Sequence, residues 1–481
     1  MLLLLAAILL LVGQLIAFSR LNTILPDGML IAGIPVGGLT QQEAAQRLRE
    51  AYNVPVELHY GEAVVQMEPA TVSFELDIDS MLAAAELSRS KKGFWNDFWD
   101  YLWNRLPPPQ NIPLRATYSD ARLRNYLQNE ISPRYNTVAE AAKPVIGDVT
   151  FQPGTAGTAL DIDRAVLLID TALRSPAPRK VNLPLAQTEP PRPGFDTLKT
   201  MLEQTIQVSG FDGLAGLYLL DLQNGQEIHF LYQQGQELIT EPDLAFTAAS
   251  TIKIPILISA FRRVENPNED IQNLIFLMID RSSNEASDLL MDRLIAPGTA
   301  PLEITADMQT LGLQSTFLAG YFYTGAPLLK VYKTPGNQRT DVQANPDPYN
   351  QTTVSEIGAL LGDIYYCAEK NGGSLVAAFP GEITQQECQT MIDYLGRNKI
   401  GYLLEAGTPD GTKIAHKHGW ISNAFGVINT IGDAGIVYTP GGNYVLVMFL
   451  HHPVELLWNT ASELEANLSW AVYNYYNLPG Q

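Results

Sequence analysis

The sequence predicts a multi-domain protein of mixed α+β and α/β class. We expect an N-terminal apolar helix, two small α+β repeats and a larger C-terminal domain. Three observations support this prediction. The chain has 481 residues, and a length of that order suggests about three domains. A pattern of strand, loop and helix occurs twice in its N-terminal part. A proline-rich segment then separates this part from the remainder of the chain.

The bulk composition fits a globular protein and argues against one class of partner. Hydrophobic residues make up 46% of the chain and charged residues 17%, which is ordinary for folded domains. The formal net charge is −20 at pH 7. Binding to nucleic acid or to anionic lipid requires clustered lysine and arginine. We therefore expect no nucleic-acid partner.

Residues 2–18 form an apolar run that only Gly13 and Gln14 interrupt. Its length is near the lower limit of about 17–25 residues for a helix that spans a membrane. A cleaved signal peptide would need basic residues before the run and a small-x-small cleavage site, and neither is present. We predict that residues 1–22 are a transmembrane signal-anchor, with cleavage and secretion as the alternative. Both interpretations place the protein outside the cytoplasm, in the periplasm or on the cell-wall side.

The first α+β repeat is predicted at residues 23–110. It begins with an apolar strand at 29–39, which ends in a glycine turn. Thr40 and Glu43 then have the spacing of a capping box, in which each side chain can bond the backbone of the other at the start of a helix. Alternating residues indicate a hairpin with strands at 54–60 and 63–67 around Gly61.

The second repeat is predicted at residues 111–186. Residues 149–153 lead to Leu-Asp-Ile-Asp at 160–163 and a helix, just as residues 65–69 lead to the same four residues at 76–79 and a helix. An aspartate directly before a helix normally caps its free amides, so we favour capping over metal binding. The histidines and cysteines show no metal-ligand spacing, and we expect no cofactor.

Short motifs in both repeats resemble a domain that occurs beside L,D-transpeptidases and in vancomycin-resistance W-type proteins. The matching segments are Val-Gly-Gly-Leu-Thr at 36–40 with Glu43-Ala44, and Gly157 with Leu-Asp-Ile-Asp at 160–163. The resemblance implies association with the cell wall, with peptidoglycan as a partner of the repeats.

An aromatic helix is predicted at residues 94–103, with tryptophans that recur at Trp95, Trp99 and Trp103. A stripe at this spacing is either core packing or an interface for membrane or sugar, because tryptophan suits both environments. Both interpretations remain open. Prolines at 107–109 end this helix.

A proline-rich linker at residues 187–194 is expected to be extended, since successive prolines exclude a helix. It sets the start of the last domain at residue 195. Within that domain, residues 195–481, lie the only two cysteines, Cys367 and Cys388. They either form a disulfide, which would suit an oxidising compartment, or remain buried thiols.

Ser250 and Lys253 form a Ser-x-x-Lys motif and lie one helical turn apart on one face. A serine hydroxyl is a poor nucleophile until a neighbouring base takes its proton, and a lysine can be that base only if its pKa is lowered. Ser88 and Lys91 repeat the motif, but in a charged stretch without a buried helix.

Two further motifs follow in order: Ser-x-Asn at Ser282 and Asn284, and Lys-x-Gly at Lys417 and Gly419. With Ser-x-x-Lys they resemble the signature of class A β-lactamases and penicillin-binding proteins. The resemblance implies an antiparallel sheet flanked by helices plus an all-helical subdomain. Supporting matches lie at residues 311–313, 352–353 and 433–437 and in a closing helix at about 459–477.

The same resemblance implies a role for each residue. Ser250 would attack the substrate carbonyl, Lys253 would be the general base, and Ser282 would relay a proton to the leaving nitrogen. A helix N-cap is the alternative role for Ser282. The remaining substrate-binding residues would be Asn284, Lys417, His418, Gly419 and Trp420, with the backbone amides of Ser250 and Trp420 as the oxyanion hole.

The sequence departs from the family pattern at several positions. Ser283 replaces the usual aspartate, and His418 replaces a threonine with an imidazole that could titrate near neutral pH. The segment between the nucleophile's helix and Ser282 is shorter than usual. Residues 333–348, where a deacylating glutamate is expected, contain none. Asp341 is the possible deacylation base, with a solvated loop acid as the alternative.

The expected activity is acylation of Ser250 by a β-lactam or a D-Ala-D-Ala-like peptide, followed by hydrolysis. A β-lactamase is the first expectation. A cell-wall D,D-peptidase with slow deacylation is the second, and an anchored peptidoglycan-binding scaffold without activity is the third.

Overall fold

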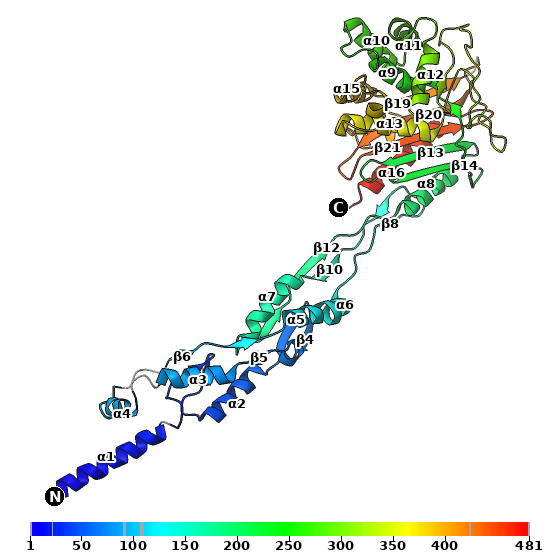
Figure 1. Ribbon diagram of the computed structural model, residues 1–481. Coiled ribbons are helices and arrows are strands. Elements are labelled where there is room, and N and C mark those ends of the chain that lie inside the picture. The colour runs from blue at the N-terminus through cyan, green and yellow to red at the C-terminus, as the bar shows by residue number, and fades with distance from the viewer. Residues whose placement is uncertain (1, 22, 90–92, 106–109, 423–424, 480–481) are drawn as a thin grey trace. The chain divides into compact units, whose positions relative to one another are not determined.

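The computed structural model describes residues 2–21, 23–89, 93–105, 110–422 and 425–479 (Figure 1). The chain forms two compact units. The first contains Met1–Glu140 and Thr155–Pro190, and the second contains Ala141–Gly154 and Pro191–Gln481.

Helix α1 (Leu2–Leu21) occupies the segment that the sequence predicts as a transmembrane anchor. Within the described part of the chain, however, no helix is both long and apolar enough to cross a membrane. The predicted transmembrane helix is therefore not supported.

Two hydrophobic cores hold the first unit together, and they interleave along the chain. One gathers residues such as Met29, Leu48 and Met81. The other combines the hairpin of β3 (Val56–Tyr60) and β4 (Ala63–Met67) with later elements. Strand β11 (Lys180–Asn182) joins β3 in parallel. The other elements of this unit are β1 (Leu30–Ile31), β2 (Ile34–Pro35), α2 (Gln41–Tyr52), β5 (Glu75–Leu76), α3 (Ile78–Arg89), β6 (Asn111–Ile112), β7 (Ala116–Thr117), α5 (Asp120–Tyr126), α6 (Ser132–Tyr135), β10 (Gly157–Leu160), α7 (Ile162–Leu173) and β12 (Leu185–Thr188).

Local signals in this unit are confirmed. Thr40 and Glu43 form the predicted capping box of α2, and Asp77 and Asp161 accept hydrogen bonds from Ser80 N and Arg164 N at the starts of α3 and α7. The predicted hairpin is β3–β4. The strand expected over residues 29–39 is instead a tight hairpin of β1 and β2, because the chain turns at residues 32–33.

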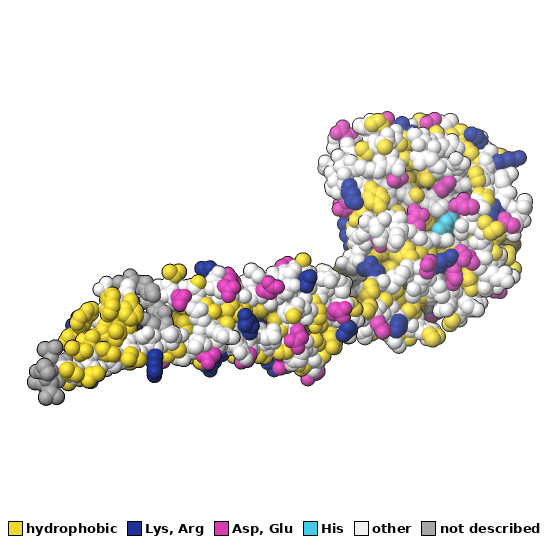
Figure 2. All heavy atoms as spheres, turned by 60° about the horizontal axis from the view of Figure 1, so that its bottom comes forward, with side chains coloured by type: hydrophobic (Ala, Val, Ile, Leu, Met, Phe, Trp, Pro, Cys, Tyr) yellow, Lys and Arg dark blue, Asp and Glu magenta, His cyan; other side chains and the backbone are white. Residues whose placement is uncertain are grey.

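Helix α4 (Phe94–Leu102) contains the aromatic stripe. Phe98 is buried, and its ring packs 5.4 Å from that of Phe18 in α1. The tryptophans are not core: Trp95, Trp99 and Trp103 are 64%, 56% and 66% exposed. Hydrophobic side chains are visible over this end of the first unit (Figure 2). The prolines at 107–109, which the sequence predicts as the end of this helix, lie outside the described residues.

The second unit is built on a six-stranded antiparallel sheet in the order β15-β14-β13-β21-β20-β19. Its residues alternate between two cores. Leu217 and Leu219 of β13 face one side, and Tyr218 and Leu220 face the other. The strands are β13 (Leu214–Asp221), β14 (Glu227–Gln233), β15 (Gln236–Leu238), β19 (Lys413–Ser422), β20 (Ile428–Tyr438) and β21 (Tyr444–His451).

Helices cover both faces of this sheet, as the resemblance implies (Figure 1). Helices α8 (Phe195–Ser209) and α16 (Trp458–Tyr476) share one core with it. Helix α13 (Val354–Lys370) and a helical subdomain share the other. The helices of that subdomain and its surroundings are α9 (Lys253–Phe261), α10 (Glu269–Ile279), α11 (Asn284–Leu290), α12 (Ala300–Thr310), α14 (Ser374–Ala378) and α15 (Gln385–Leu395).

A small hairpin of β8 (Lys143–Pro144) and β9 (Phe151–Gln152) belongs to the second unit although it precedes the proline-rich segment. Phe151 joins the core beneath α16. Asn474 of α16 donates a hydrogen bond to the carbonyl oxygen of Val149 at 2.8 Å. The hairpin therefore packs as part of the second unit.

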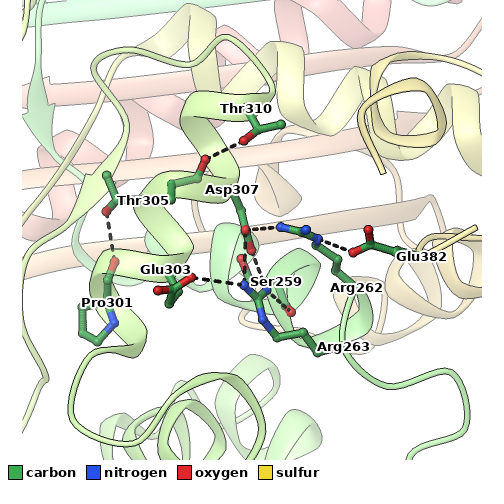
Figure 3. A network of polar contacts seen from close by, with 10 residues as sticks. Ser259, Arg262, Arg263, Pro301, Glu303, Thr305, Asp307, Thr310 and Glu382 are labelled. Carbon is green, nitrogen blue, oxygen red and sulfur yellow. Dashed lines mark hydrogen bonds and ion pairs between the residues drawn. The ribbon is translucent and has the colours of Figure 1, made fainter. Parts of the chain in front are cut away.

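Buried charge fixes the C-terminal end of α9. Arg262 and Arg263 follow α9, and both bind the carboxylate of Asp307 on α12 (Figure 3). The Asp307 side chain is only 3% exposed. Arg262 also binds Glu382 at 2.7 Å. Two guanidinium groups on one buried carboxylate satisfy it fully, so α9 and α12 are held together at this point.

Cys367 of α13 and Cys388 of α15 form a disulfide. Of the two alternatives that the sequence leaves open, the structure has the disulfide. It ties two helices that pack beside the sheet.

Candidate active site

Ser250 lies in a short 3₁₀ turn, η3 (Ala249–Ile252), between strand β16 (Phe246–Thr247) and helix α9. The preceding Ala249 adopts a positive φ of 50°. A non-glycine residue in this left-handed conformation costs about 1–3 kcal/mol and is typically found at functional sites. The turn places Ser250 on the wall of a cavity of ≈ 370 Å³.

Lys253 is the first residue of α9 and points at the nucleophile. Its Nζ lies 3.0 Å from Ser250 Oγ and 3.0 Å from Asn284 Oδ1. It also lies 2.7 Å from the carbonyl oxygen of Ser282 and 3.1 Å from Ser282 Oγ. The charged ammonium could donate to three of these oxygens, whereas the neutral amine donates through two N–H groups and keeps a lone pair that can accept the Ser250 proton.

Electrostatics favour that neutral form. The Lys253 side chain is fully buried, and burial together with the positive charge of Lys417 lowers its pKa to about 7. Asp288 opposes this shift only in part. A lysine base with a pKa near the working pH is efficient, because a large fraction of it is neutral.

Ser282 completes the contact to the nucleophile. Its Oγ donates a hydrogen bond to Ser250 Oγ at 2.9 Å. Ser282 has a positive φ of 51°. The N-cap of α11 is Ser283, whose side chain accepts from Ala286 N, so Ser282 is not the cap and its hydroxyl is free to face Ser250.

Strand β19 brings the Lys-x-Gly motif against the nucleophile's turn. A Cβ atom on Gly419 would lie 2.5 Å from the backbone nitrogen of Ser250. Only glycine allows this approach, which brings the strand that carries Trp420 beside the Ser250 amide. Lys417 is fully buried and donates to the carbonyl oxygen of His418 at 2.9 Å. Burial lowers the pKa of Lys417 to about 8.

His418 differs from the sequence expectation. Burial, aided by the charge of Lys417, lowers its pKa to about 3, so the imidazole stays neutral and does not titrate near neutral pH. Its ring stacks on Trp420 at 5.3 Å, and its Nδ1 lies 3.3 Å from Asn398 Nδ2. It does not line the cavity that contains Ser250.

Asp341, the possible deacylation base, is not brought to the nucleophile. Arg339 donates hydrogen bonds to both of its carboxylate oxygens, at 3.0 and 2.6 Å. This pairing lowers the pKa of Asp341 to about 2. The side chain is 57% exposed and does not line the cavity that contains Ser250. A carboxylate held this way is a weak base.

The cavity walls include residues that the motifs do not reveal. Phe322 lies over Lys253, with Nζ 5.5 Å from its ring centre. Its backbone nitrogen donates to Asp288 at 2.9 Å. Asp347 is the one carboxylate among the described lining residues. The lining consists of Ala249, Ser250, Asn284, Tyr321, Phe322, Tyr323, Gly325, Ala326, Asp347, Tyr349, Asn350, Trp420 and Ile421. The aromatic run at 321–323 was the only sequence signal for this wall.

A sequence profile described as "Beta-lactamase enzyme family" matches residues 198–275 and 266–476. It begins after both N-terminal repeats, so their likeness to peptidoglycan-binding domains is not confirmed. No curated protein matches the chain at a significant level.

Solved structures of this fold are similar to the chain. One, "Structure of PBP-A", is 24% identical, with a TM-score of 0.42, covering 60% of this chain and 98% of that one. Another, "Ancestral (GNCA) Beta-lactamase class A", is 21% identical, with a TM-score of 0.39, covering 57% and 98%.

Proposed function

Because the chain belongs to the β-lactamase enzyme family, we propose that its second unit is a serine hydrolase that opens β-lactam amides through an acyl-enzyme at Ser250. The contact between Lys253 Nζ and Ser250 Oγ at 3.0 Å carries this proposal. It joins a nucleophile to a buried base whose pKa is about 7, and this pairing is what serine acylation requires.

Acylation would begin with transfer of the Ser250 hydroxyl proton to Lys253. Neutral Lys253 takes the Ser250 hydroxyl proton while Oγ attacks the lactam carbonyl. The oxygen of that carbonyl becomes negative, and the backbone amides of Ser250 and Trp420 stabilise it. The carbon–nitrogen bond then breaks, and the nitrogen receives a proton from Lys253 through Ser282 Oγ. This oxygen lies 3.1 Å from Lys253 Nζ and 2.9 Å from Ser250 Oγ.

Two further residues would hold the substrate. Asn284 Oδ1 contacts Lys253 at 3.0 Å, and its amide is placed to meet a substrate amide in the cavity that it lines. Lys417 does not line that cavity, so its charge would act on the substrate carboxylate from within the fold; it would also keep Lys253 less protonated, which is consistent with its effect on the Lys253 pKa.

The test uses the full chain, a chromogenic cephalosporin and a fluorescent penicillin. We expect turnover of the cephalosporin and a penicillin adduct whose mass maps to Ser250. Ser250→Ala should abolish both, while Ser88→Ala, in the second Ser-x-x-Lys motif, should change neither. Absence of any Ser250-dependent adduct would refute the proposal and favour a wall-binding scaffold without activity.

A D,D-peptidase with slow deacylation is the second candidate. The pairing of Asp341 with Arg339 favours it, because that loop acid is then a poor hydrolytic base. A long-lived penicillin adduct, no cephalosporin turnover and release of D-alanine from a D-Ala-D-Ala peptide would distinguish this activity from a β-lactamase.

We also propose that the protein works outside the cytoplasm, with the first unit against peptidoglycan. The disulfide Cys367–Cys388 supports an oxidising compartment. The sequence motifs of the two repeats support association of the first unit with the cell wall. Sedimentation of the protein with purified peptidoglycan sacculi tests the second point, and loss of sedimentation on deletion of residues 1–140 is expected.

A further inference from the structure

A second carboxylate is held close to the nucleophile by the backbone. Asp347 follows the loop that contains Asp341, and its nitrogen donates to Thr247 Oγ1 at 2.8 Å. Thr247 ends the strand that leads into the turn of Ser250. The amide of Tyr349 donates to Asp347 Oδ1, also at 2.8 Å. These bonds fix one carboxylate oxygen and tie the residue to the element that carries the nucleophile.

Asp347 lines two cavities that share part of their walls. It lines the cavity of ≈ 370 Å³ that contains Ser250. It also lines a second cavity of ≈ 350 Å³, and Ile421 is the other residue common to both. Polar side chains are frequent in the wall of the second cavity, which includes Thr247, Asn345, Ser422, Asn429, Thr430 and His451.

His451 contributes a largely buried imidazole to the wall of this second cavity. The residue is only 5% exposed, and its Nδ1 lies 3.0 Å from Thr430 Oγ1. Its Nε2 is buried without a hydrogen-bond partner among the described residues. The cavity has room for several waters, and its polar side chains can hold them.

We propose that Asp347 is the general base that activates the hydrolytic water for deacylation of Ser250. The proposal rests on the proposed function, because it concerns the second half of the same reaction. Water from the second cavity would reach the acyl carbonyl past the carboxylate. No other carboxylate among the described residues lines the cavity that contains Ser250.

Deacylation would begin at the carboxylate of Asp347. Asp347 takes a proton from water as the water oxygen bonds to the acyl carbon. The bond from that carbon to Ser250 Oγ then breaks, the proton that Asp347 took is passed to Oγ through Ser282 or Lys253, and the product leaves as a carboxylic acid with Asp347 and Ser250 both restored. Burial raises the pKa of Asp347, which makes it a stronger base than an exposed aspartate. Asp341 has the opposite shift.

The experiment compares Asp347→Asn with Asp341→Asn in the full chain. The asparagine keeps an oxygen for the Tyr349 amide and removes only the basic charge. Fluorescent penicillin gives the rate of acylation, and intact mass after removal of free penicillin gives the rate at which the adduct is lost. We expect Asp347→Asn to acylate within about threefold of the wild type and to lose the adduct about 10²- to 10⁴-fold more slowly. Asp341→Asn should behave as the wild type.

The outcomes separate this inference from the proposed function. No Ser250 adduct in the wild-type protein would overturn both. A wild-type adduct that is never hydrolysed, or an Asp347→Asn adduct lost at the wild-type rate, would overturn the role of Asp347 alone. If the asparagine variant fails to fold, Asp347→Glu replaces it: the displaced carboxylate should slow loss of the adduct without slowing acylation, and an unchanged rate of loss contradicts the role.

Discussion

The charge of Lys417 lowers the pKa of Lys253, and both lysines are fully buried in one site. Burial is the larger cause of the lowered pKa of Lys253, and the charge of Lys417 adds to it. A like charge disfavours protonation of its neighbour, so the pair generates a neutral amine beside Ser250 close to neutral pH. This relationship yields the first two predictions.

Acylation of Ser250 should depend on pH through the Lys253 base. The base acts only when it is neutral, and its pKa is about 7. The acylation rate should therefore rise about tenfold per pH unit below that value and level off above it. Labelling by fluorescent penicillin between pH 5 and pH 9 measures this. A rate that is flat across the range would contradict a lysine base.

Lys417→Met should move that profile to higher pH. Removing the positive charge stabilises the protonated form of Lys253, so the pKa of Lys253 rises and less neutral amine is present at pH 7. Lys413→Met, at the exposed start of the same strand, is the matched control and should leave the midpoint unchanged. An unshifted midpoint in Lys417→Met would show that the two lysines do not interact.

Gly419→Ala should abolish acylation. The new Cβ would lie 2.5 Å from Ser250 N, so β19 and the turn of the nucleophile must separate. Loss of an oxyanion donor alone costs about 10²- to 10³-fold in rate. Gly372→Ala is the control, since its nearest neighbour is 3.8 Å away. Penicillin labelling at wild-type rate in Gly419→Ala would contradict this account of the oxyanion hole.

Asp307→Asn should destabilise the second unit. The substitution leaves Arg262 and Arg263 without their shared buried carboxylate. Hydrogen bonds to charged groups contribute about 1.5–3 kcal/mol each, and we expect a loss of that order in the free energy of unfolding by denaturant. Glu303→Gln, 4.0 Å from Arg263 and 52% exposed, should cost far less. Equal losses would argue against the network.

Reduction of Cys367–Cys388 should lower the thermal stability of the second unit. A disulfide that closes a loop of 21 residues stabilises by about 3 kcal/mol, because it restricts the unfolded chain. Comparing melting with and without a reductant, and with Cys367→Ser, measures the effect. An unchanged melting temperature on reduction would contradict this estimate.

The core of the site was predictable because its residues have fixed spacings in regular structure. Ser250 and Lys253 are one turn apart, and Ser282 lies two residues before Asn284, the first residue of α11, so sequence alone relates the two members of each pair. Asp347 was not predictable in this way. It follows an irregular loop and reaches the cavity through a bond to Thr247, 100 residues earlier in the chain, and no periodicity marks such a contact.

In the first unit too, local features were predictable from the sequence and long-range contacts were not. The capping box at Thr40 and the β3–β4 hairpin are local signals, and both formed as expected. The pairing of β11 with β3 joins residues more than 100 positions apart, and the repeat pattern did not indicate it. The exposure of Trp95 and Trp99 depends on which face meets α1, which spacing along one helix does not decide.

The hairpin of β8 and β9 has a practical consequence for how the protein withstands proteolysis. The chain passes between its two units three times, at Glu140–Ala141, Gly154–Thr155 and Pro190–Pro191. A cut at the third crossing would leave residues 141–154 on the N-terminal fragment, still packed beneath α16. A single cut in the proline-rich segment therefore should not release the C-terminal fragment. The two fragments should elute together until the second unit is denatured.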